Sequence, residues 1–394
     1  MELTFVHDGP LFYDEQENYY EFAYHELFER YTYLADNISF LIRTKKIDSW
    51  RHYTKVPEEI RVISVPNFKG LKVYFKNKKR AKKIVKEQIK KTDIVVLRTQ
   101  SSIASLALKY VKKYKKPYIV ECVGCSWDTY WNHGIIGKII APYMFLEQKK
   151  MIREAPYVYY VTNEFLQHRY PTKGKNINCS NVVLGKTDDN ILTNRLHRIA
   201  MMDNNSLVLG TAAAIDTRYK GHEYVIRAIP VLLDRGIDIV YKLAGGLTGQ
   251  KQDFYLRDLA EELDVSDHVI FLGSLSAEDM GAYYDDLDIY VQPSKQEGLP
   301  RAVIESMSRG CPAIGSDLAG IPELIDKKCL FRPGNTDEFI KVLCDINEKE
   351  TLKALAINNF IKSKEYEKEK LTHKRKRFYS DFMKNEFGVV YENN

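Results

Sequence analysis

Two glutamates, Glu297 and Glu305, are the residues whose spacing most clearly offers chemistry. They lie eight positions apart, on either side of a Gly-Leu-Pro turn at residues 298–300. An ionised carboxylate is a strong hydrogen-bond acceptor, and paired sugar hydroxyls are donors that suit it. We therefore expect the two side chains to hold an elongated, polyhydroxylated ligand at two separate points.

The residues around the glutamates predict the elements that position them. Pro300 suits a first helical turn, where its missing N–H needs no partner, and Gly310 suits a helix end. The predicted order is a strand at Ile289–Gln292, a polar loop at Pro293–Leu299, a helix at Pro300–Arg309 and a strand at Ala313–Ser316. Ligands of open parallel sheets bind beyond the carboxyl ends of the strands, and a helix N-terminus there offers amides to a phosphate.

This stretch resembles the donor-site signature of the retaining glycosyltransferases of family 4, which include bacterial capsular and exopolysaccharide enzymes. The matching residues are Ser294, Glu297-Gly298, Glu305, Gly310, Ser316-Asp317 and Gly320-Ile-Pro-Glu-Leu. The resemblance is motif-specific from about residue 207 to residue 325. It implies an α/β chain with the GT-B fold: two Rossmann-like, doubly wound domains facing across a cleft, with a C-terminal helix that crosses back to the first. It also implies that Glu297 faces the transferred sugar and that Glu305 holds the ribose hydroxyls of a nucleotide sugar.

The same resemblance assigns further donor-side residues. Lys220-Gly221 matches a Lys-Gly pair at a helix start that holds the diphosphate. An arginine about five positions before that lysine is usual, but Ala214 and Ile215 stand there, and we expect Arg218 to replace it. The other expected donor-binding residues are Thr211, Gly245, Gly246, Ser274, Leu275, Gly298, Leu299, Pro300 and Arg301.

The first half of the chain alternates candidate strands and helices. The candidate strands are Leu3–His7, Ile38–Ile42, Arg61–Val65, Asp93–Arg98, Tyr118–Cys122, Tyr157–Val161 and Asn178–Leu184, and the clearest helices are Ser102–Tyr114 and Lys138–Arg153. Continuous β-branched runs are typical of a parallel sheet that is covered on both faces. We expect an acceptor-binding domain at 1–190, joined by a last helix at about 370–394, and a nucleotide-sugar domain at 200–370. Residues 185–205 show no strong period and are interpreted as the linker between the domains. The last helix is expected to dock on the first domain through Phe378, Tyr379, Phe382 and Met383.

Acceptor-side candidates follow the ends of the first-domain strands. They are Gly9, Arg98, Thr99, Trp127 and Asp128. The resemblance would place a histidine at position 123, but the residue is Val123. Trp127 and Asp128 belong to a Trp- and His-containing segment just beyond it, which either packs a long loop or faces the acceptor or the transferred sugar.

Composition sets the broad class of the protein. The 394 residues are 44% hydrophobic and 28% charged, which indicates a globular protein of two ordinary domains. The start, MELTFVHDGP, reads as a strand rather than a signal peptide, and no apolar run approaches the roughly 20 residues of a spanning helix. The six cysteines include a single C-x-x-C at Cys122 and Cys125, so we expect free thiols of a cytoplasmic protein and no zinc site. We expect no metal and no cofactor, the nucleotide sugar being a substrate.

Positive charge is unevenly distributed. The net charge is +6, and Lys69–Lys91 carries eleven Lys or Arg residues and one acid, Glu87. Residues 134–153 mix isoleucines and aromatics with lysines and an arginine. Both segments are either ordinary solvated or packed helix faces or a surface for anionic lipid headgroups, with the enzyme peripheral on the inner face of the membrane. No nucleic-acid-binding pattern accompanies the charge.

The function implied is transfer of a sugar, with retention, from a nucleoside-diphosphate sugar to a saccharide or polyprenyl-diphosphate-linked glycan in surface polysaccharide synthesis. Uridine is preferred as the commonest base among such enzymes. A non-catalytic nucleotide-sugar-binding or regulatory protein on a decayed GT-B fold is the alternative, favoured by Val123 and by the missing arginine. A dinucleotide-dependent oxidoreductase would need a G-x-G-x-x-G after a strand, and the sequence has none.

Overall fold

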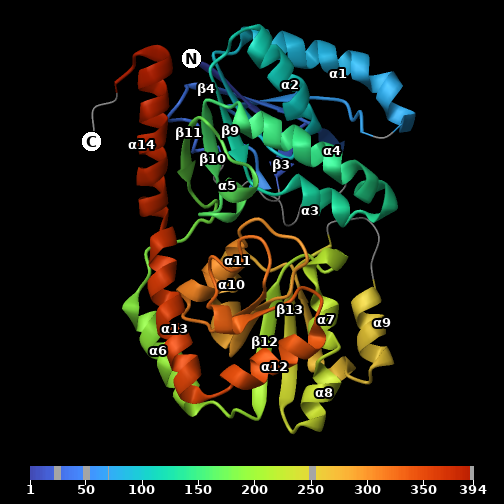
Figure 1. Cartoon of the computed structure of the whole chain (residues 1–394), viewed down its shortest axis with the longest axis vertical. Helices are drawn as coiled ribbons and strands as arrows, with labels where there is room; N and C mark the ends of the chain where they lie inside the picture. Colours follow the sequence, from blue (N-terminus) through green and yellow to red (C-terminus); the bar gives the residue numbers. More distant parts are fainter. Residues whose placement is uncertain (22–27, 48–53, 70, 248–253, 391–394) are drawn as a thin grey trace. The chain divides into compact units, whose positions relative to one another are not determined.

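The chain divides into two units in the computed structural model, which describes residues 1–21, 28–47, 54–69, 71–247 and 254–390 (Figure 1). The first unit is Met1–Cys179 together with Thr372–Asn394, and the second is Ser180–Leu371. Each unit has its own parallel sheet with helices packed on it.

The main sheet of the first unit has seven strands in the described part of the chain, in the order β11-β10-β9-β8-β1-β4-β7. All neighbouring strands are parallel. The strands are β1 (Glu2–Val6), β4 (Asn37–Ile42), β7 (Ile60–Ser64), β8 (Ile94–Arg98), β9 (Tyr118–Cys122), β10 (Tyr157–Tyr160) and β11 (Lys175–Asn178). Every residue of β8 and β9 is buried, because helices cover both faces of the sheet and continuous apolar runs then fit better than alternation.

Helices of the first unit connect these strands or lie on the sheet. They are α1 (Leu71–Lys91), α2 (Ser102–Lys113), α3 (Ser126–Trp131), α4 (Gly134–Arg153), α5 (Phe165–Arg169) and the larger part of α14 (Lys368–Phe387). On α14, Phe378 and Phe382 meet the ring of Tyr157 on β10 edge-on, with centroids 6.0 and 4.9 Å apart. The chain's last helix thus contributes core residues to the first unit, as the sequence predicted.

A small second sheet follows β1. Its described strands run in the order β5-β2-β3-β6, and they are β2 (Leu11–Tyr13), β3 (Tyr19–Glu21), β5 (Thr44–Lys46) and β6 (Thr54–Lys55). The sequence analysis did not predict this sheet, because strands of two or three residues are too short to show a period.

The second unit repeats the doubly wound plan. Its sheet has the order β14-β13-β12-β15-β16-β17, formed by β12 (Ser206–Ala212), β13 (Asp238–Ala244), β14 (Val269–Gly273), β15 (Ile289–Gln292), β16 (Ala313–Ser316) and β17 (Leu330–Phe331). Its α-helices are α6 (Asp189–Met201), α7 (His222–Ile226), α8 (Ile229–Asp234), α9 (Tyr255–Glu262), α10 (Ala277–Asp286), α11 (Arg301–Ser308), α12 (Thr336–Ile346) and α13 (Lys349–Ser363), with short 3-10 turns η1 (Arg218–Lys220), η2 (Ser266–His268), η3 (Lys327–Cys329) and η4 (Lys364–Tyr366).

Both sheets reverse their strand order at one point, and this is where ligands of such sheets bind. In the first unit the reversal lies between β1 and β8, and in the second it lies between β12 and β15. The loops that follow these four strands therefore hold the residues of interest.

Two sequence predictions are wrong in this part of the chain. The strand expected at Asn178–Leu184 is instead β11, at Lys175–Asn178, and Leu184 makes only an isolated bridge to Glu367. Residues 185–205, interpreted as a linker, contain helix α6, which Asp188 caps by accepting from the N–H of Asn190. The helix shows little apolar periodicity because one of its two buried residues is Arg195, whose guanidinium donates to the carbonyls of Tyr284 and Leu287.

Candidate active site

Glu297 lies at the strand-order reversal of the second unit, and its carboxylate is the centre of a hydrogen-bond cluster. Its Oε1 accepts from Lys220 Nζ at 2.6 Å, from Ser294 Oγ at 2.8 Å and from Gln292 Nε2 at 3.1 Å. The loop after β15 supplies Ser294 and Glu297, while Lys220 comes from the loop after β12. The contact between Lys220 and Glu297 thus joins the two loops that flank the reversal.

Residues on and just after strand β15 support this cluster. Tyr290 OH donates to Gln292 Oε1 at 2.8 Å. The Gln292 amide nitrogen is then oriented to donate to Ser294 Oγ and Glu297 Oε1. Tyr290, Gln292 and Ser294 are buried. Their hydrogen bonds fix the position of the Glu297 carboxylate before any ligand arrives.

Lys220 carries the positive charge of this site. Burial by itself would lower the pKa of Lys220, but the Glu297 carboxylate outweighs burial and raises it. His222, two residues further on, contributes no charge near neutral pH, because burial lowers its pKa to about 4. Lys220 is therefore a half-buried ammonium group paired with a carboxylate.

Glycines let the loops approach one another closely. Gly221 has a φ of +77°, and a Cβ there would lie 2.0 Å from the carbonyl oxygen of Pro293. Gly245 and Gly246 follow β13, where Cβ atoms would lie 1.9 Å from the Ala213 carbonyl oxygen and 2.2 Å from Ser274 Oγ. Side chains at these positions would push the loops apart, so the glycines keep the loop carrying Lys220 against its neighbours.

Glu305 lies on α11, about one and a half turns from Pro300, which precedes the helix. Its Oε2 accepts a hydrogen bond from Tyr284 OH at 2.8 Å. Burial, followed by the nearby Glu305 carboxylate, raises the pKa of Tyr284 well above its usual value, so the phenol stays a hydrogen-bond donor. Glu305 is half-buried, and its other oxygen has no hydrogen bond to the described protein residues that the structure records.

The other donor-side candidates occupy several environments. Gly298, Leu299 and Pro300 lead into α11, Arg301 opens it, and the carbonyl of Gly298 accepts from the N–H of Gly320 at 2.9 Å. Ser274 and Leu275 follow β14 and are partly exposed. Thr211 is fully buried, with its hydroxyl donating to the Val291 carbonyl at 2.7 Å and accepting from Tyr241 OH at 2.8 Å.

Arg218, the expected replacement for the missing arginine, is exposed. Its guanidinium lies 3.9 Å from the centroid of the Tyr255 ring, on α9. The described structure records no direct contact between Arg218 and either Lys220 or Glu297.

Sequence reasoning did not identify Gln292 and Tyr284 as residues of the site. Gln292 is the last residue of β15, where the alternation of the strand places its side chain next to the loop. Tyr284 is one of two adjacent tyrosines on α10, and nothing in its spacing distinguishes it from Tyr283. A polar residue at the carboxyl end of β15 was the available signal for Gln292.

The acceptor-side candidates flank the strand-order reversal of the first unit. Gly9 follows β1 with a φ of +48°, and a Cβ there would lie 2.6 Å from Ile42. Arg98 ends β8 and donates from Nε to Glu121 Oε2 at 2.9 Å, while the Thr99 hydroxyl donates to the Glu121 carbonyl at 3.1 Å. Both Arg98 and Thr99 are buried. Their side chains therefore hold the carboxyl end of β8 to that of β9.

Trp127 and Asp128 lie on α3. Trp127 stacks on Trp131 with ring centroids 5.1 Å apart, and it meets Phe145 of α4 edge-on. Asp128 Oδ1 lies 3.6 Å from the guanidinium of Arg169, whereas its buried Oδ2 has no hydrogen-bond partner among the described residues. Burial, opposed by Arg169, raises the pKa of Asp128.

Comparison with known proteins shows which sequences this chain resembles. Residues 198–369 match the family model "Glycosyl transferases group 1". The chain is 29% identical over 381 residues to Protein CapJ of Staphylococcus aureus, covering 95% of this chain and 90% of that protein. It is 30% identical over 116 residues to the putative colanic acid biosynthesis glycosyltransferase WcaL of Escherichia coli K12, covering 28% of each.

Solved structures share the fold. Sucrose-phosphate synthase from Thermosynechococcus elongatus superposes with a TM-score of 0.72 at 14% identity, over 98% of this chain and all of that one. HepE of Anabaena in complex with UDP gives 0.66 at 14% identity, over 97% of this chain and all of that one. The chain therefore has the GT-B fold, and its residues 198–369 match a glycosyl transferases group 1 domain.

Proposed function

We propose that this enzyme transfers a sugar, with retention of configuration, from a nucleoside-diphosphate sugar to a saccharide or lipid-linked glycan of a surface polysaccharide. The observation that carries the proposal is the Lys220–Glu297 pair at the strand-order reversal of the group 1 domain. In this interpretation Lys220 and Glu297 act on the reacting end of the donor, and Glu305 holds the ribose.

The charge on Lys220 suits the leaving group. As the bond between the anomeric carbon and the phosphate oxygen breaks, negative charge develops on the diphosphate, and a positioned ammonium stabilises it. Donor binding would draw Lys220 toward the diphosphate and free Glu297 Oε1 to accept from a sugar hydroxyl. The acceptor oxygen then bonds to the anomeric carbon, and its proton passes to the leaving phosphate. This route assigns no step to a metal ion, and among the described residues no group of three His, Cys, Asp or Glu side chains is placed to hold one.

Uridine is the proposed base. HepE, which has the same fold, was solved in complex with UDP. Ser274 and Leu275, after β14, are proposed to meet the base, and Gly245-Gly246 to lie beside the diphosphate. Arg218, whose exposed guanidinium lies over the ring of Tyr255, is proposed as a second cation. It would turn toward the diphosphate when the donor binds.

The acceptor is proposed to be a surface-polysaccharide glycan, because the names of several relatives, WcaL among them, refer to such biosynthesis. The first unit would receive it near Gly9, Arg98, Thr99, Trp127 and Asp128. A peripheral position on the cytoplasmic face of a membrane would bring the enzyme to a lipid-linked acceptor. Among the described residues, no helix is long and apolar enough to cross a membrane.

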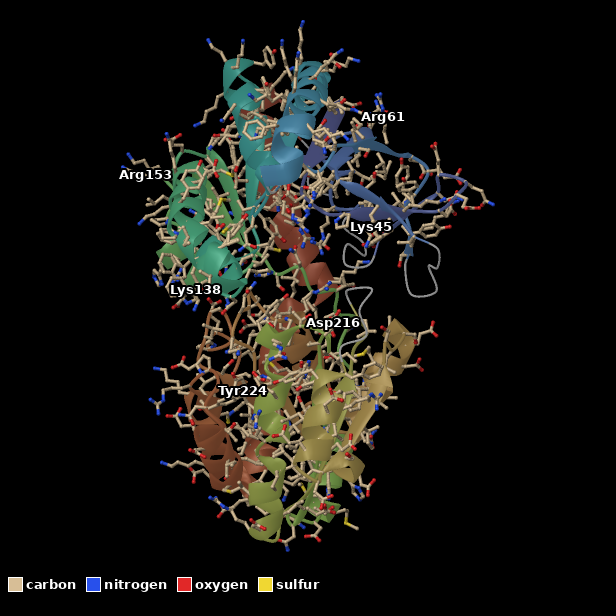
Figure 2. All side chains as sticks on the ribbon, turned by 90° about the vertical axis from the view of Figure 1, so that its right-hand side faces the viewer. Lys45, Arg61, Lys138, Arg153, Asp216 and Tyr224 are labelled. Atoms are coloured by element: carbon tan, nitrogen blue, oxygen red, sulfur yellow. The ribbon has the colours of Figure 1, made fainter. Side chains whose placement is uncertain are left out.

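A basic and apolar surface on α4 supports that position. Ile136, Ile139 and Tyr143 are 74%, 74% and 65% exposed, and they repeat at the spacing of one helix face. Lys138 and Arg153 reach away from the same helix (Figure 2). Exposed apolar side chains flanked by lysines suit the interface of an anionic bilayer. Helix α1, in the basic segment Lys69–Lys91, adds positive charge, although Gly70 of that segment lies outside the described residues.

Thermal unfolding with nucleotides and nucleotide sugars tests the donor site. A ligand at a hundred times its Kd should stabilise the fold by about 2.7 kcal/mol. We expect UDP to raise the Tm and Glu305→Gln to abolish that shift, with Glu262→Gln, at an exposed glutamate of the same unit, as the control. A Tm that no nucleotide changes would contradict the proposal.

A non-catalytic nucleotide-sugar-binding protein is the second candidate, favoured by Val123 and by the exposed position of Arg218. The two functions separate on one variant. Loss of sugar transfer with retained UDP binding in Glu297→Gln would support the enzyme. If purified wild-type protein binds UDP but transfers no sugar to any extracted lipid-linked glycan, that result would support the non-catalytic binding protein.

A further inference from the structure

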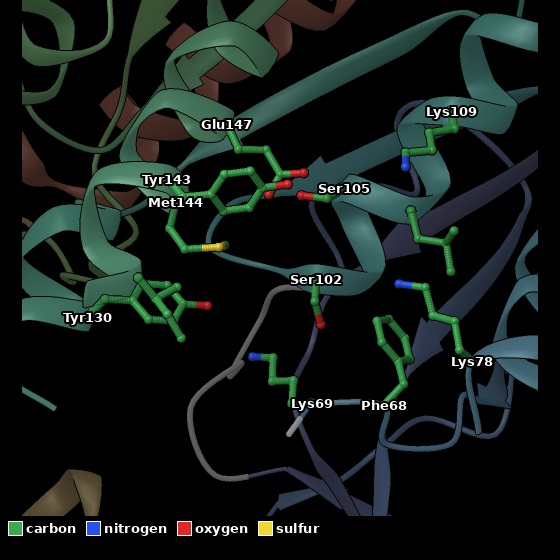
Figure 3. A pocket seen from close by; sticks show the side chains of 12 residues that line it. Phe68, Lys69, Lys78, Ser102, Ser105, Lys109, Tyr130, Tyr143, Met144 and Glu147 are labelled. Carbon is green, nitrogen blue, oxygen red and sulfur yellow. The ribbon is translucent and has the colours of Figure 1, made fainter. Parts of the chain in front are cut away.

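A cavity of about 530 Å³ in the first unit is lined by residues other than the acceptor-side candidates named above. It is bounded by α2 and α4 and by the segment that leads into α1 (Figure 3). Three lysines, Lys69, Lys78 and Lys109, line it together with the hydroxyls of Ser102, Tyr130 and Tyr143. Its volume is that of a small-molecule site.

The lysines are positioned in different ways. Lys78 lies with its ammonium 4.4 Å from the centroid of the Phe68 ring, and the Asn77 side chain beside it donates to the Asn67 carbonyl at 2.7 Å. Lys109 extends from α2 and is exposed. Lys69 forms an ion pair with the buried carboxylate of Asp8. Figure 3 shows the ammonium groups of Lys78 and Lys109 directed toward the middle of the cavity, whereas that of Lys69 points toward the side on which Tyr130 lies.

Asp8 and Glu147 offset part of this positive charge. Asp8 accepts from the N–H groups of Ser102 and Ile103 at 2.9 and 3.0 Å, so the N-terminus of α2 is already capped and is not the anion site. Glu147 lines the cavity beside Tyr143, on the side away from Lys69 and Lys78 (Figure 3). Charges of +3 and −2 leave an excess of +1, and the other basic residues of α1 add to the positive field.

The opposite wall is apolar and continues onto the exposed face of α4. Ile140, Tyr143 and Met144 line the cavity. Ile136, Ile139, Ile140 and Tyr143 follow the spacing i, i+3, i+4 and i+7, so the wall of the cavity and the exposed isoleucines lie on one helix face. A ligand with an anionic end among the lysines and a hydrocarbon chain along α4 would match both surfaces.

We propose that this cavity binds the phosphorylated end of a lipid-linked acceptor, with the first part of its hydrocarbon chain on Ile140 and Met144. The inference rests on the proposed function, since it names where the first unit holds the acceptor's lipid. Lys78 and Lys109 pair with the phosphate groups, and Tyr130 donates a hydrogen bond to one of their oxygens. Burial raises the pKa of Tyr130, so its hydroxyl remains a donor at neutral pH.

Equilibrium binding of three probes to the full chain tests the proposal: farnesyl diphosphate, inorganic diphosphate and farnesol, each below its aggregation concentration. We expect farnesyl diphosphate to bind at least tenfold more tightly than either other probe, and more weakly as salt rises. The double variant K78Q/K109Q should weaken farnesyl diphosphate binding at least tenfold. Ile140→Gln should weaken binding of farnesyl diphosphate but not of inorganic diphosphate.

The matched control is K82Q/K83Q, which removes the same two charges from exposed positions of α1 that do not line the cavity. Its binding should stay within twofold of wild type. Equal binding by K78Q/K109Q and K82Q/K83Q would overturn the proposal. Inorganic diphosphate binding as tightly as farnesyl diphosphate would show a site for a free anion. An unchanged Tm for each variant shows that its loss of binding is not unfolding.

The binding of UDP separates this inference from the proposed function. K78Q/K109Q should bind UDP as wild type does, because every residue proposed to meet UDP belongs to the second unit. If UDP binds and farnesyl diphosphate does not, only the cavity assignment fails. If farnesyl diphosphate binds and UDP does not, the assignment of the donor site is wrong. The interpretation of the cavity ligand as an acceptor is then rejected as well.

Discussion

Lys220 Nζ lies 2.6 Å from Glu297 Oε1, and this contact joins the loops on the two sides of the strand-order reversal in the second unit. Its side chains are 21% and 10% exposed, so the pair is only slightly screened by solvent. Removing either partner leaves the other charge buried without its counterion, which is the costly way to break such a pair.

Lys220→Ala should therefore lower kcat/KM for sugar transfer by about 10²–10³-fold, the loss typical when one positioned group that stabilises developing charge is removed. Lys242→Ala is the matched control, because Lys242 is equally exposed and pairs with Asp286 on the same unit. Steady-state kinetics of both variants would check this. A similar loss in the two variants would mean that Lys220 acts only through stability.

Tyr284→Phe removes the hydroxyl that donates to Glu305 Oε2. A hydrogen bond to a charged group contributes about 1.5–3 kcal/mol. If it orients Glu305 for the ribose, the KM for the donor should rise by about tenfold or more while the acceptor KM stays constant. Tyr283→Phe is the control, since Tyr283 OH donates to the Lys242 carbonyl instead. Equal donor KM values in the two variants would show that Tyr284 has no part in donor binding.

The fold could be predicted from the sequence for a physical reason. The continuous buried runs of β8, β9 and β15 allow little besides a covered parallel sheet, and Pro300 and Gly310 mark the ends of α11 to within a residue. Helix α6 was missed because it buries Arg195 through main-chain carbonyls rather than through an apolar stripe.

Long-range pairings could not be read from the chain. The partner of Lys220 is 77 positions away, and Asp8 finds Ser102 94 positions away. Which polar residues meet at a strand-order reversal depends on the order of the strands in the sheet, and no local pattern encodes that order. The cavity near α4 has the same origin, since its walls come from three separated segments.

Asp8 supplies a test of stability against pH. Burial alone would raise the pKa of Asp8, but Lys69 and the amide hydrogen bonds from α2 outweigh it and lower the pKa to about 2. A folded-state pKa below the unfolded value of about 3.8 means that ionised Asp8 stabilises the fold above about pH 4 and that this contribution disappears as the pH falls through 2. The shift corresponds to about 2 kcal/mol.

We therefore expect Asp8→Asn to lower the Tm at pH 7 and the difference from wild type to shrink between about pH 4 and pH 2. Thermal unfolding followed by circular dichroism across this range would measure it. Asp36→Asn, at an exposed carboxylate that pairs with the chain's amino terminus, is the control and should change the Tm little. A constant difference at all pH values would contradict the assigned role of the Asp8 charge.

Asp128 has a buried oxygen without a hydrogen-bond partner among the described residues, next to the stacked Trp127. If that oxygen accepts from an acceptor hydroxyl, Asp128→Asn should raise the acceptor KM several-fold and leave the donor KM unchanged. Glu154→Gln, at an exposed carboxylate paired with Lys112, is the comparison. An unaltered acceptor KM in Asp128→Asn would assign Asp128 to the packing of α3 alone.

The exposed face of α4 makes the proposed membrane interaction testable without disturbing the fold. Ile136 and Ile139 are each 74% exposed, so I136N/I139N removes little buried area and should leave the Tm nearly unchanged. Because both side chains would enter the lipid interface, the fraction of protein that sediments with vesicles containing anionic lipid should fall by about tenfold or more.

Met201→Asn is the control for that measurement, because Met201 is 75% exposed and belongs to the second unit. It should sediment like wild type. Raising the salt concentration should release wild-type protein in part, since lysines contribute through screened electrostatic attraction, whereas the apolar contribution of Ile136 and Ile139 persists. If I136N/I139N sediments as wild type does, the bound surface lies elsewhere and α4 serves only as a wall of the cavity.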